Sequence, residues 1–95
     1  MNAHTPYPID ASDVLLPPEL LELTEQIAAN VHEIWSRQRI ADGWRYGKER
    51  NDTLKEHPCL VPYKDLPENE KAYDRQTAIE TLKVVLQSGF EIRKK

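Results

Sequence analysis

Apolar residues recur every three or four positions in the first half of the chain, which is the spacing of one face of an α-helix. The stripe consists of Leu20, Leu23, Ile27, Val31, Ile34 and Trp35. Thr24 is its one polar member, whereas His32 lies just outside it. Pro17 favours a helix start because its missing N–H would be unpaired there anyway, and Gly43 suits the left-handed residue after a helix end. The pattern predicts a helix over about residues 17–41, with His32 as a structural or surface residue.

A second stretch with helical spacing carries two neighbouring stripes. The stronger one holds Ala78, Ile79, Leu82, Val85 and Leu86, and the weaker one holds Tyr73, Thr77, Thr81 and Val84. Asp65 and Glu68 have capping-box spacing at the start, and Gly89 suits the end, so we predict a helix over about residues 66–88. The two stripes cover more of the circumference than one packing partner needs. The surplus must therefore pack on the middle of the chain or on another chain.

The segment between these helices is irregular. Cys59–Val61 is short and apolar with proline on each side, which favours a brief buried strand or extended segment. Phe90–Ile92 alternates like another short strand. The expected fold class is mainly α with minor β: two packed amphipathic helices bridged by an irregular segment with short extended strands. We expect an extended N-terminal arm over residues 1–8, one domain over 9–92 and a basic tail over 93–95.

Length and charge exclude several classes of protein. With 95 residues, the chain is too short for a doubly wound sheet or a barrel. Its net charge of −3 also differs from the basic character of a nucleic-acid-binding domain. Its single cysteine excludes an internal disulfide and is typical of a reducing, cytoplasmic setting. No apolar run is long enough for membrane insertion, and the N-terminus does not have the pattern of a signal peptide.

Motifs for catalysis or metal binding are incomplete. His32-Glu33 begins a zinc-protease pattern, but Ser36 stands where the second histidine is needed. His57 and Cys59 have no second ligand pair, so we predict no metal site and interpret Cys59 as an inert buried thiol. Neither a nucleophile elbow nor a phosphate loop is present. We therefore expect no enzyme, no catalytic residues and no cofactor.

The stretch after the first predicted helix is the best candidate for a binding site. Residues 37–55 hold six Lys or Arg against three Asp or Glu, although the chain is acidic overall. Aromatic faces beside guanidinium groups can hold an anionic ring by stacking and charge-assisted hydrogen bonds. The candidate ligand- or partner-binding residues are Trp44, Arg45, Tyr46, Arg50, Lys55 and His57. The same residues could instead fill the end of a small core, so both interpretations stay open.

Three short motifs in succession give the chain a more specific signature. They are N-x-H-E-x-W from Asn30 to Trp35, G-W-x-Y-G from Gly43 to Gly47, and H-P-x-L-V from His57 to Val61. In this combination the chain resembles a ryanodine-receptor repeat, the RyR domain, over about residues 7–92. The resemblance implies a compact, mainly helical module with short extended pieces.

The same resemblance carries expectations about function. In the large calcium-release channels such repeats come in tandem pairs in the cytosolic part, outside the pore, as peripheral interaction elements. The family has no established catalytic residues to carry over. This chain holds one repeat and lacks the long inter-repeat loop that channel kinases modify, so it is similar to single-repeat prokaryotic or viral members. We expect a non-enzymatic interaction module, paired as a homodimer or with another protein domain. The alternative is a sensor for a small anionic, nucleotide-derived ligand.

Overall fold

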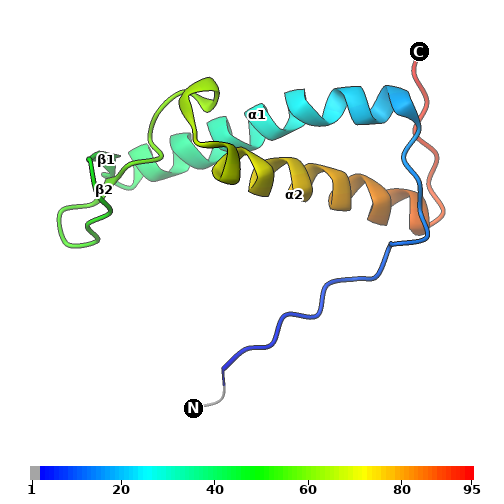
Figure 1. Cartoon of the computed structure of the whole chain (residues 1–95), viewed down its shortest axis with the longest axis horizontal. Coiled ribbons are helices and arrows are strands. Elements are labelled where there is room, and N and C mark those ends of the chain that lie inside the picture. Colours follow the sequence, from blue (N-terminus) through cyan, green and yellow to red (C-terminus); the bar gives the residue numbers. More distant parts are fainter. Residues whose placement is uncertain (1–2) are drawn as a thin grey trace.

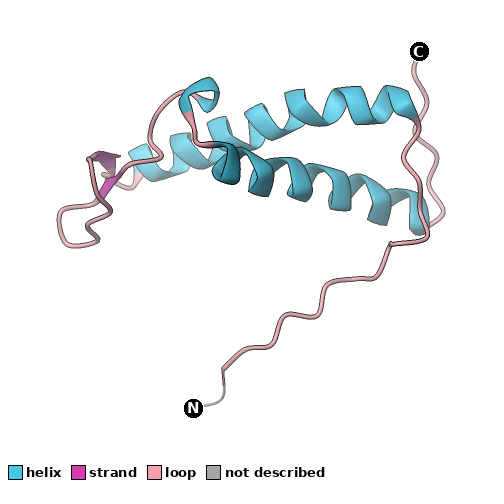
Figure 2. Ribbon diagram, in the orientation of Figure 1, coloured by secondary structure: helices cyan, strands magenta, loops and turns pink. Residues whose placement is uncertain are grey.

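Two long helices lie side by side in the computed structural model, which describes residues 3–95 (Figure 1). Helix α1 spans Pro18–Ala41 and helix α2 spans Glu68–Gln87. The segment between them holds three short elements: strand β1 (Arg45–Tyr46), strand β2 (Glu56–His57) and the 3-10 helix η1 (Tyr63–Asp65). Figure 2 shows how small the strands are beside the helices. This architecture confirms the predicted fold class of mainly α with minor β.

An extended arm leads into the helix pair. Residues 3–10 are exposed and without regular structure, and they run away from the helices (Figure 1). Residues 1 and 2 of the predicted arm lie outside the described part. The arm joins the body at Ala11, which is buried, and the Gln87 side chain of α2 donates a hydrogen bond to the Asp10 carbonyl at 2.7 Å. Within residues 3–95, neither helix is both long and apolar enough to cross a membrane.

Both helices end at the glycines that the sequence singles out. Gly43 has φ +92° and Gly89 has φ +95°, a left-handed conformation that glycine adopts without a steric penalty. After α1, the Gly43 N–H donates to the Ile40 carbonyl and the Trp44 N–H donates to the Arg39 carbonyl, both at 3.0 Å. These two bonds form a Schellman motif, which turns the chain back over the last helical turn. The turn places Trp44 beside Arg39.

The start of α2 differs from the prediction. Its N-cap is Pro67 and no side chain caps it, so the expected capping box between Asp65 and Glu68 is wrong. Leu66 precedes a proline and is extended, with ψ 148°, because the proline ring disfavours the helical conformation of the residue before it. Asp65 is thereby separated from the helix and belongs to η1.

Neither Cys59–Val61 nor Phe90–Ile92 forms a strand. The real pair is β1 and β2, which run parallel with Arg45 opposite Glu56 and Tyr46 opposite His57. Pairing stops at His57 because Pro58 lacks the N–H that a longer ladder would use. Cys59–Val61 therefore continues as a turn, and its cysteine is half-buried rather than buried. Phe90–Ile92 follows the turn at Gly89 and pairs with no strand among the described residues.

The buried face of α1 is not centred on its largest apolar residues. Its buried residues are Thr24, Ala28 and His32, and the one buried residue of α2 is Ala78. Ala28 is 0% exposed and Ala78 is 2% exposed. Small side chains let two helices approach closely, so the alanines mark the line of contact. The hydroxyl of Thr24 remains paired because it donates to the Leu21 carbonyl at 2.6 Å.

Part of the expected apolar stripe therefore lies uncovered. Leu23 is 41% exposed and Ile34 is 39% exposed. On α2 the weaker stripe also stays open, since Tyr73 is 70% exposed and Thr77 is exposed. The interpretation that the middle of the chain covers this stripe is not supported, because that segment packs elsewhere. Its η1 lies on the side of Glu25, which accepts a hydrogen bond from the Tyr63 hydroxyl at 2.9 Å.

Candidate functional site

An arginine stacks between two tryptophans at the end of α1. The guanidinium carbon of Arg39 is 5.5 Å from the ring centre of Trp35 and 4.7 Å from that of Trp44. Trp35 and Arg39 are one helical turn apart, and the Schellman turn at Gly43 supplies Trp44. Each such contact contributes about 0.5–2 kcal/mol, more when it is desolvated. Within residues 3–95, Arg39 takes part in no ion pair, so its charge is not neutralised by a carboxylate.

Two histidines complete the aromatic cluster around Trp35. The His32 ring stacks on Trp35 with 5.6 Å between centroids, and the His57 ring meets it edge-on at 5.0 Å. The Nε2 atom of His32 donates to the Val61 carbonyl at 2.7 Å, since a carbonyl can only accept. His32 is 4% exposed, so it is a structural residue at the heart of the buried face and not beside it. This bond ties the middle of the chain to α1.

The protonation of His57 follows from its surroundings. Burial lowers its pKa, and the positive charges of Arg50 and Arg39 lower it further, against a smaller opposing effect from Glu70 and other acids. Its Nδ1 accepts the Cys59 backbone N–H at 3.0 Å, so the neutral ring carries its proton on Nε2. His57 is therefore a neutral ring with one N–H donor in the neutral pH range.

A cavity of about 280 Å³ opens beside this cluster, where α2 begins. Its lining comprises His32, Trp35, Arg39, Arg50, His57, Cys59, Leu66, Glu70 and Asp74. Two arginines come from α1 and the loop between β1 and β2, whereas the two carboxylates come from α2. The cavity thus has a basic side, an acidic side and an aromatic wall.

The acidic side changes the proton chemistry of the cavity. Burial raises the pKa of Asp74; the neighbouring His32 opposes that rise, and Glu70 adds to it. Burial also raises the pKa of the Cys59 thiol, and the charges of Glu70 and Asp74 raise it further. A thiol held protonated is a poor nucleophile and a poor metal ligand. Among residues 3–95 no three His, Cys, Asp or Glu side chains are grouped so that they could hold a metal ion.

The structure separates the six predicted site residues into two groups. Arg50 and His57 line the cavity, and Trp44 adjoins it through Arg39 and through the His57 ring, 6.2 Å away. Arg50 also donates to Asp52 of its own loop at 2.9 Å. These three residues therefore lie together at the end of α1.

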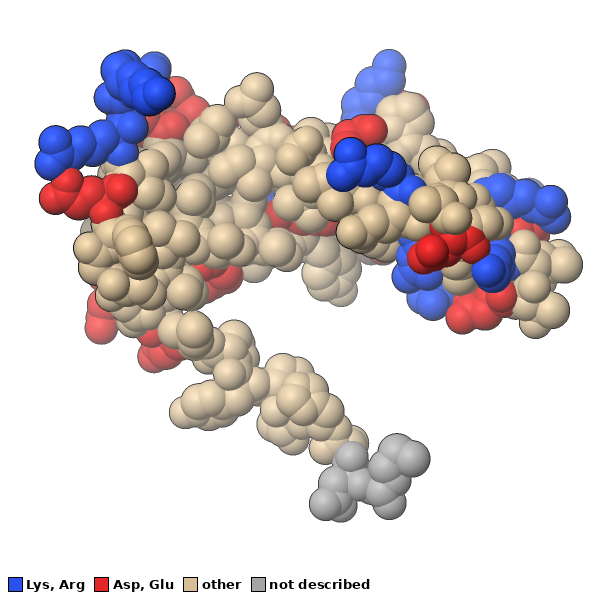
Figure 3. All heavy atoms as spheres, turned by 180° about the vertical axis from the view of Figure 1, so that it is seen from behind, with Lys and Arg blue, Asp and Glu red and all other residues tan. Residues whose placement is uncertain are grey.

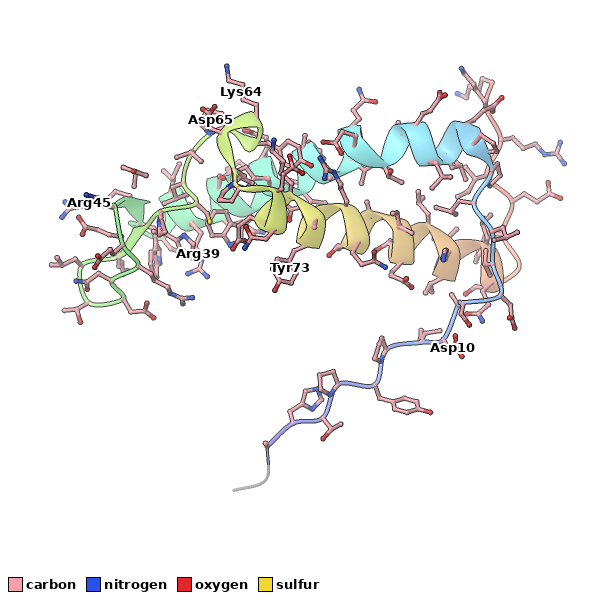
Figure 4. All side chains as sticks on the ribbon, in the orientation of Figure 1. Asp10, Arg39, Arg45, Lys64, Asp65 and Tyr73 are labelled. Carbon is pink, nitrogen blue, oxygen red and sulfur yellow. The ribbon has the colours of Figure 1, made fainter. Side chains whose placement is uncertain are left out.

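The other three predicted residues lie away from the cavity. Arg45 points outward from β1 at the end of the molecule and pairs with Glu56 at 3.2 Å (Figure 4). Tyr46 is 58% exposed. The Lys55 ammonium donates to the Asp42 carbonyl at 2.8 Å and so holds the turn after α1.

Sequence reasoning missed seven of the nine lining residues, and four of the seven carry clear signals in hindsight. Arg39 stands four residues after Trp35, and Glu70 stands four before Asp74, which places each pair on one helix face. The meeting of these pairs depends on how the helices cross, which no local pattern states. A second and larger open groove, about 680 Å³, lies near Asp10 between the arm and α2. It contains none of the predicted residues, and one of its walls is the exposed arm.

The geometry is that of a small two-helix module with an aromatic and arginine cluster at one end. Residues 4–94 match the model of the RyR domain family, which is nearly the whole of the 95-residue chain. The chain therefore belongs to the RyR domain family and carries one such domain. The match confirms the resemblance drawn from the three motifs, and each motif has a structural role. His32 and Trp35 build the cavity, Gly43 and Trp44 close α1, and the stretch from His57 to Val61 packs on both.

Proposed function

We propose that this chain is a non-enzymatic interaction module that acts by pairing with a second copy of itself or with another protein domain. The uncovered apolar stripe of α1 carries the proposal. Leu23 and Ile34 remain about two-fifths exposed, although they belong to the most apolar stripe of the chain. Contiguous apolar surface of this kind on a small protein is typical of interaction sites. The single free thiol of Cys59 favours a reducing, cytoplasmic location.

The chemistry of the cavity favours binding over turnover. Its one thiol has a raised pKa, and the Nδ1 atom of its His57 ring accepts a backbone N–H, so His57 does not serve as a base for that thiol. The Ser36 hydroxyl lies 3.5 Å from His32 Nε2, but that nitrogen already donates to the Val61 carbonyl at 2.7 Å. Sedimentation velocity from low to high micromolar concentration tests the interaction module. We expect a reversible rise in mass towards a dimer. A strict monomer over the whole range would contradict self-association and leave only pairing with another domain.

A second candidate function is a sensor for a small anionic ligand with a planar ring, such as a nucleotide derivative. The observation in its favour is that Arg39, with no carboxylate partner among the described residues, lies beside the aromatic wall of the cavity. The anionic group would bind on the arginine side, because Glu70 and Asp74 repel it on the other. The ring would stack near Trp35, and its N–H donors would face the two carboxylates.

A thermal-shift screen with nucleotides tests this candidate. A ligand at about 100 times its dissociation constant adds about 2.7 kcal/mol to the free energy of unfolding. We expect Arg39→Gln to abolish the shift and Arg45→Gln, at an exposed arginine outside the cavity, to retain it. An equal shift in wild type and Arg39→Gln would place the ligand elsewhere, and no shift with any nucleotide would count against the class.

A further inference from the structure

One side of α1 lacks charged residues over most of the length of the helix. On α1 a sector about 100° wide, counted at about 100° per residue, contains only uncharged residues. They are Leu20, Leu23, Ile27, Asn30, Val31, Ile34, Gln38 and Ala41. We call this sector of α1 the neutral face. Helix α2 is not part of it, because Glu70, Asp74 and Glu80 lie about 20° from Thr77, Thr81 and Tyr73 on the same helical count.

The neutral face lies on one side of the helix pair, opposite η1. Its centre is about 110° before the buried line through Ala28. Glu25, which accepts the hydrogen bond from Tyr63 of η1, lies about 60° after that line. Figure 3 views the molecule from behind and shows mostly uncharged atoms over the middle of the helices, with some charged side chains among them and more towards the ends. No described segment covers the face fully, since Leu23 and Ile34 are exposed and Leu20, Ile27 and Val31 are half-buried.

We propose that the neutral face binds a second copy of this chain in antiparallel orientation, about a twofold axis next to Ile27. This inference rests on the proposed self-association and adds its surface and geometry. The large apolar residues of the face are Leu20, Leu23, Ile27, Val31 and Ile34. Their spacing of three, four, four and three reads the same in both directions. Antiparallel pairing therefore brings Ile27 beside itself, Leu23 beside Val31 of the second copy, and Leu20 beside Ile34 of the second copy.

Charged residues at the rim agree with this orientation. Glu19 and Arg37 lie at the same angle on α1, on the edge of the neutral face. Reversal about Ile27 places Arg37 of one copy within two residues of Glu19 of the other, so two opposite-charge contacts form per dimer. Glu22 and Glu33 lie beyond this edge, and an acidic flank disfavours docking on an anionic lipid surface.

The size of the neutral face predicts a weak, reversible dimer. A strip of α1 about 10 Å wide and about 32 Å long gives a footprint of roughly 300 Å². A standard interface buries about 800 Å² on each partner, so this face alone is smaller than the interface of a tight dimer.

The central experiment is sedimentation equilibrium on the full chain with Ile34→Glu and Ile40→Glu. Both residues lie on α1 and are exposed, but Ile40 is outside the neutral face. We expect Ile34→Glu to raise the dimer dissociation constant at least ~100-fold, because two carboxylates would lose water against Leu20. Ile40→Glu should stay within about twofold of wild type. A dimer that Ile34→Glu leaves intact would overturn this surface while self-association stands, and a monomeric wild type would overturn self-association itself.

Cysteine cross-linking tests the orientation without a change in charge. In a Cys59→Ser background, Ile27→Cys should form an intermolecular disulfide under mild oxidation. The reason is that position 27 of one copy lies beside position 27 of the other copy at the twofold axis. Ile40→Cys is the matched control and should remain a thiol at the same concentration. Failure of Ile27→Cys to cross-link, with the dimer still present, would refute the antiparallel arrangement. The charge swap Glu19→Arg with Arg37→Glu should restore the affinity that either change alone lowers.

Discussion

The hydrogen bond from His32 to Val61 holds the middle of the chain against α1, and the substitution His32→Leu tests its importance. Leucine keeps an apolar side chain at a position that is 4% exposed, but it removes the donor 2.7 Å from the Val61 oxygen. Leaving a buried carbonyl unpaired costs about 1–3 kcal/mol. Loss of the stacking between His32 and Trp35 adds about 0.5–1.5 kcal/mol. We therefore expect the free energy of unfolding to fall by about 1.5–4.5 kcal/mol, the sum of the two effects.

Equilibrium urea unfolding measures this loss. Far-UV circular dichroism follows the helices, and tryptophan fluorescence follows Trp35 and Trp44 near the substituted site. The melting temperature should drop by roughly 6–36 °C, at about 4–8 °C per kcal/mol for a domain of this size. His4→Leu is the matched control, since His4 lies on the exposed arm and should change stability by less than about 0.5 kcal/mol. A loss in His32→Leu as small as that of the control would refute the structural role of His32.

Two further predictions concern the strand pair and pH. Gly47→Ala should destabilise the fold by about 1–3 kcal/mol, because a Cβ at Gly47 would overlap the Cβ of Glu56. Unchanged urea unfolding of this variant would contradict the close approach of the two residues. The pKa of His57 is lowered in the folded state, so His57 binds a proton more readily in the unfolded chain. The free energy of unfolding should therefore fall as the pH drops below 6.5, the pKa of histidine in the unfolded chain. Urea unfolding at several pH values should show this decline, and His57→Gln should flatten it. A profile with the same slope in both proteins would assign the decline to other groups.

The ends of the helices follow from local chemistry. Pro17 and Pro18 at the start of α1, and Gly43 and Gly89 after the two helices, impose backbone conformations that need no distant contact. At the start of α2, however, the local capping rule gave a wrong prediction. Asp65 has the right spacing for a cap, but Pro67 holds the chain extended in between.

Local composition also located part of the candidate site. Trp44, Arg50 and His57 belong to the segment that composition marks as basic and aromatic, and they lie at or beside the cavity. Arg45 has the same composition signal but points outward from β1, and its neighbour Tyr46 is exposed as well, so this strand turns neither side chain towards the cavity. Side-chain direction within a two-residue strand depends on its partner strand, which sequence patterns did not locate.

The sequence by itself determined the two helices, their glycine ends, the membership of the RyR domain family and the absence of a complete catalytic motif. These properties depend on residues near one another in the chain or on a characteristic order of motifs. Only the tertiary structure decided which side of α1 is buried. Ala28 and Ala78 permit a closer helix approach than the larger Leu23 and Ile34 would, so close packing turns the apolar stripe partly towards solvent. The exposure of the neutral face results from that rotation. The cavity also depends on it, because its lining combines residues of α1 and α2 that only the crossing of the helices brings together.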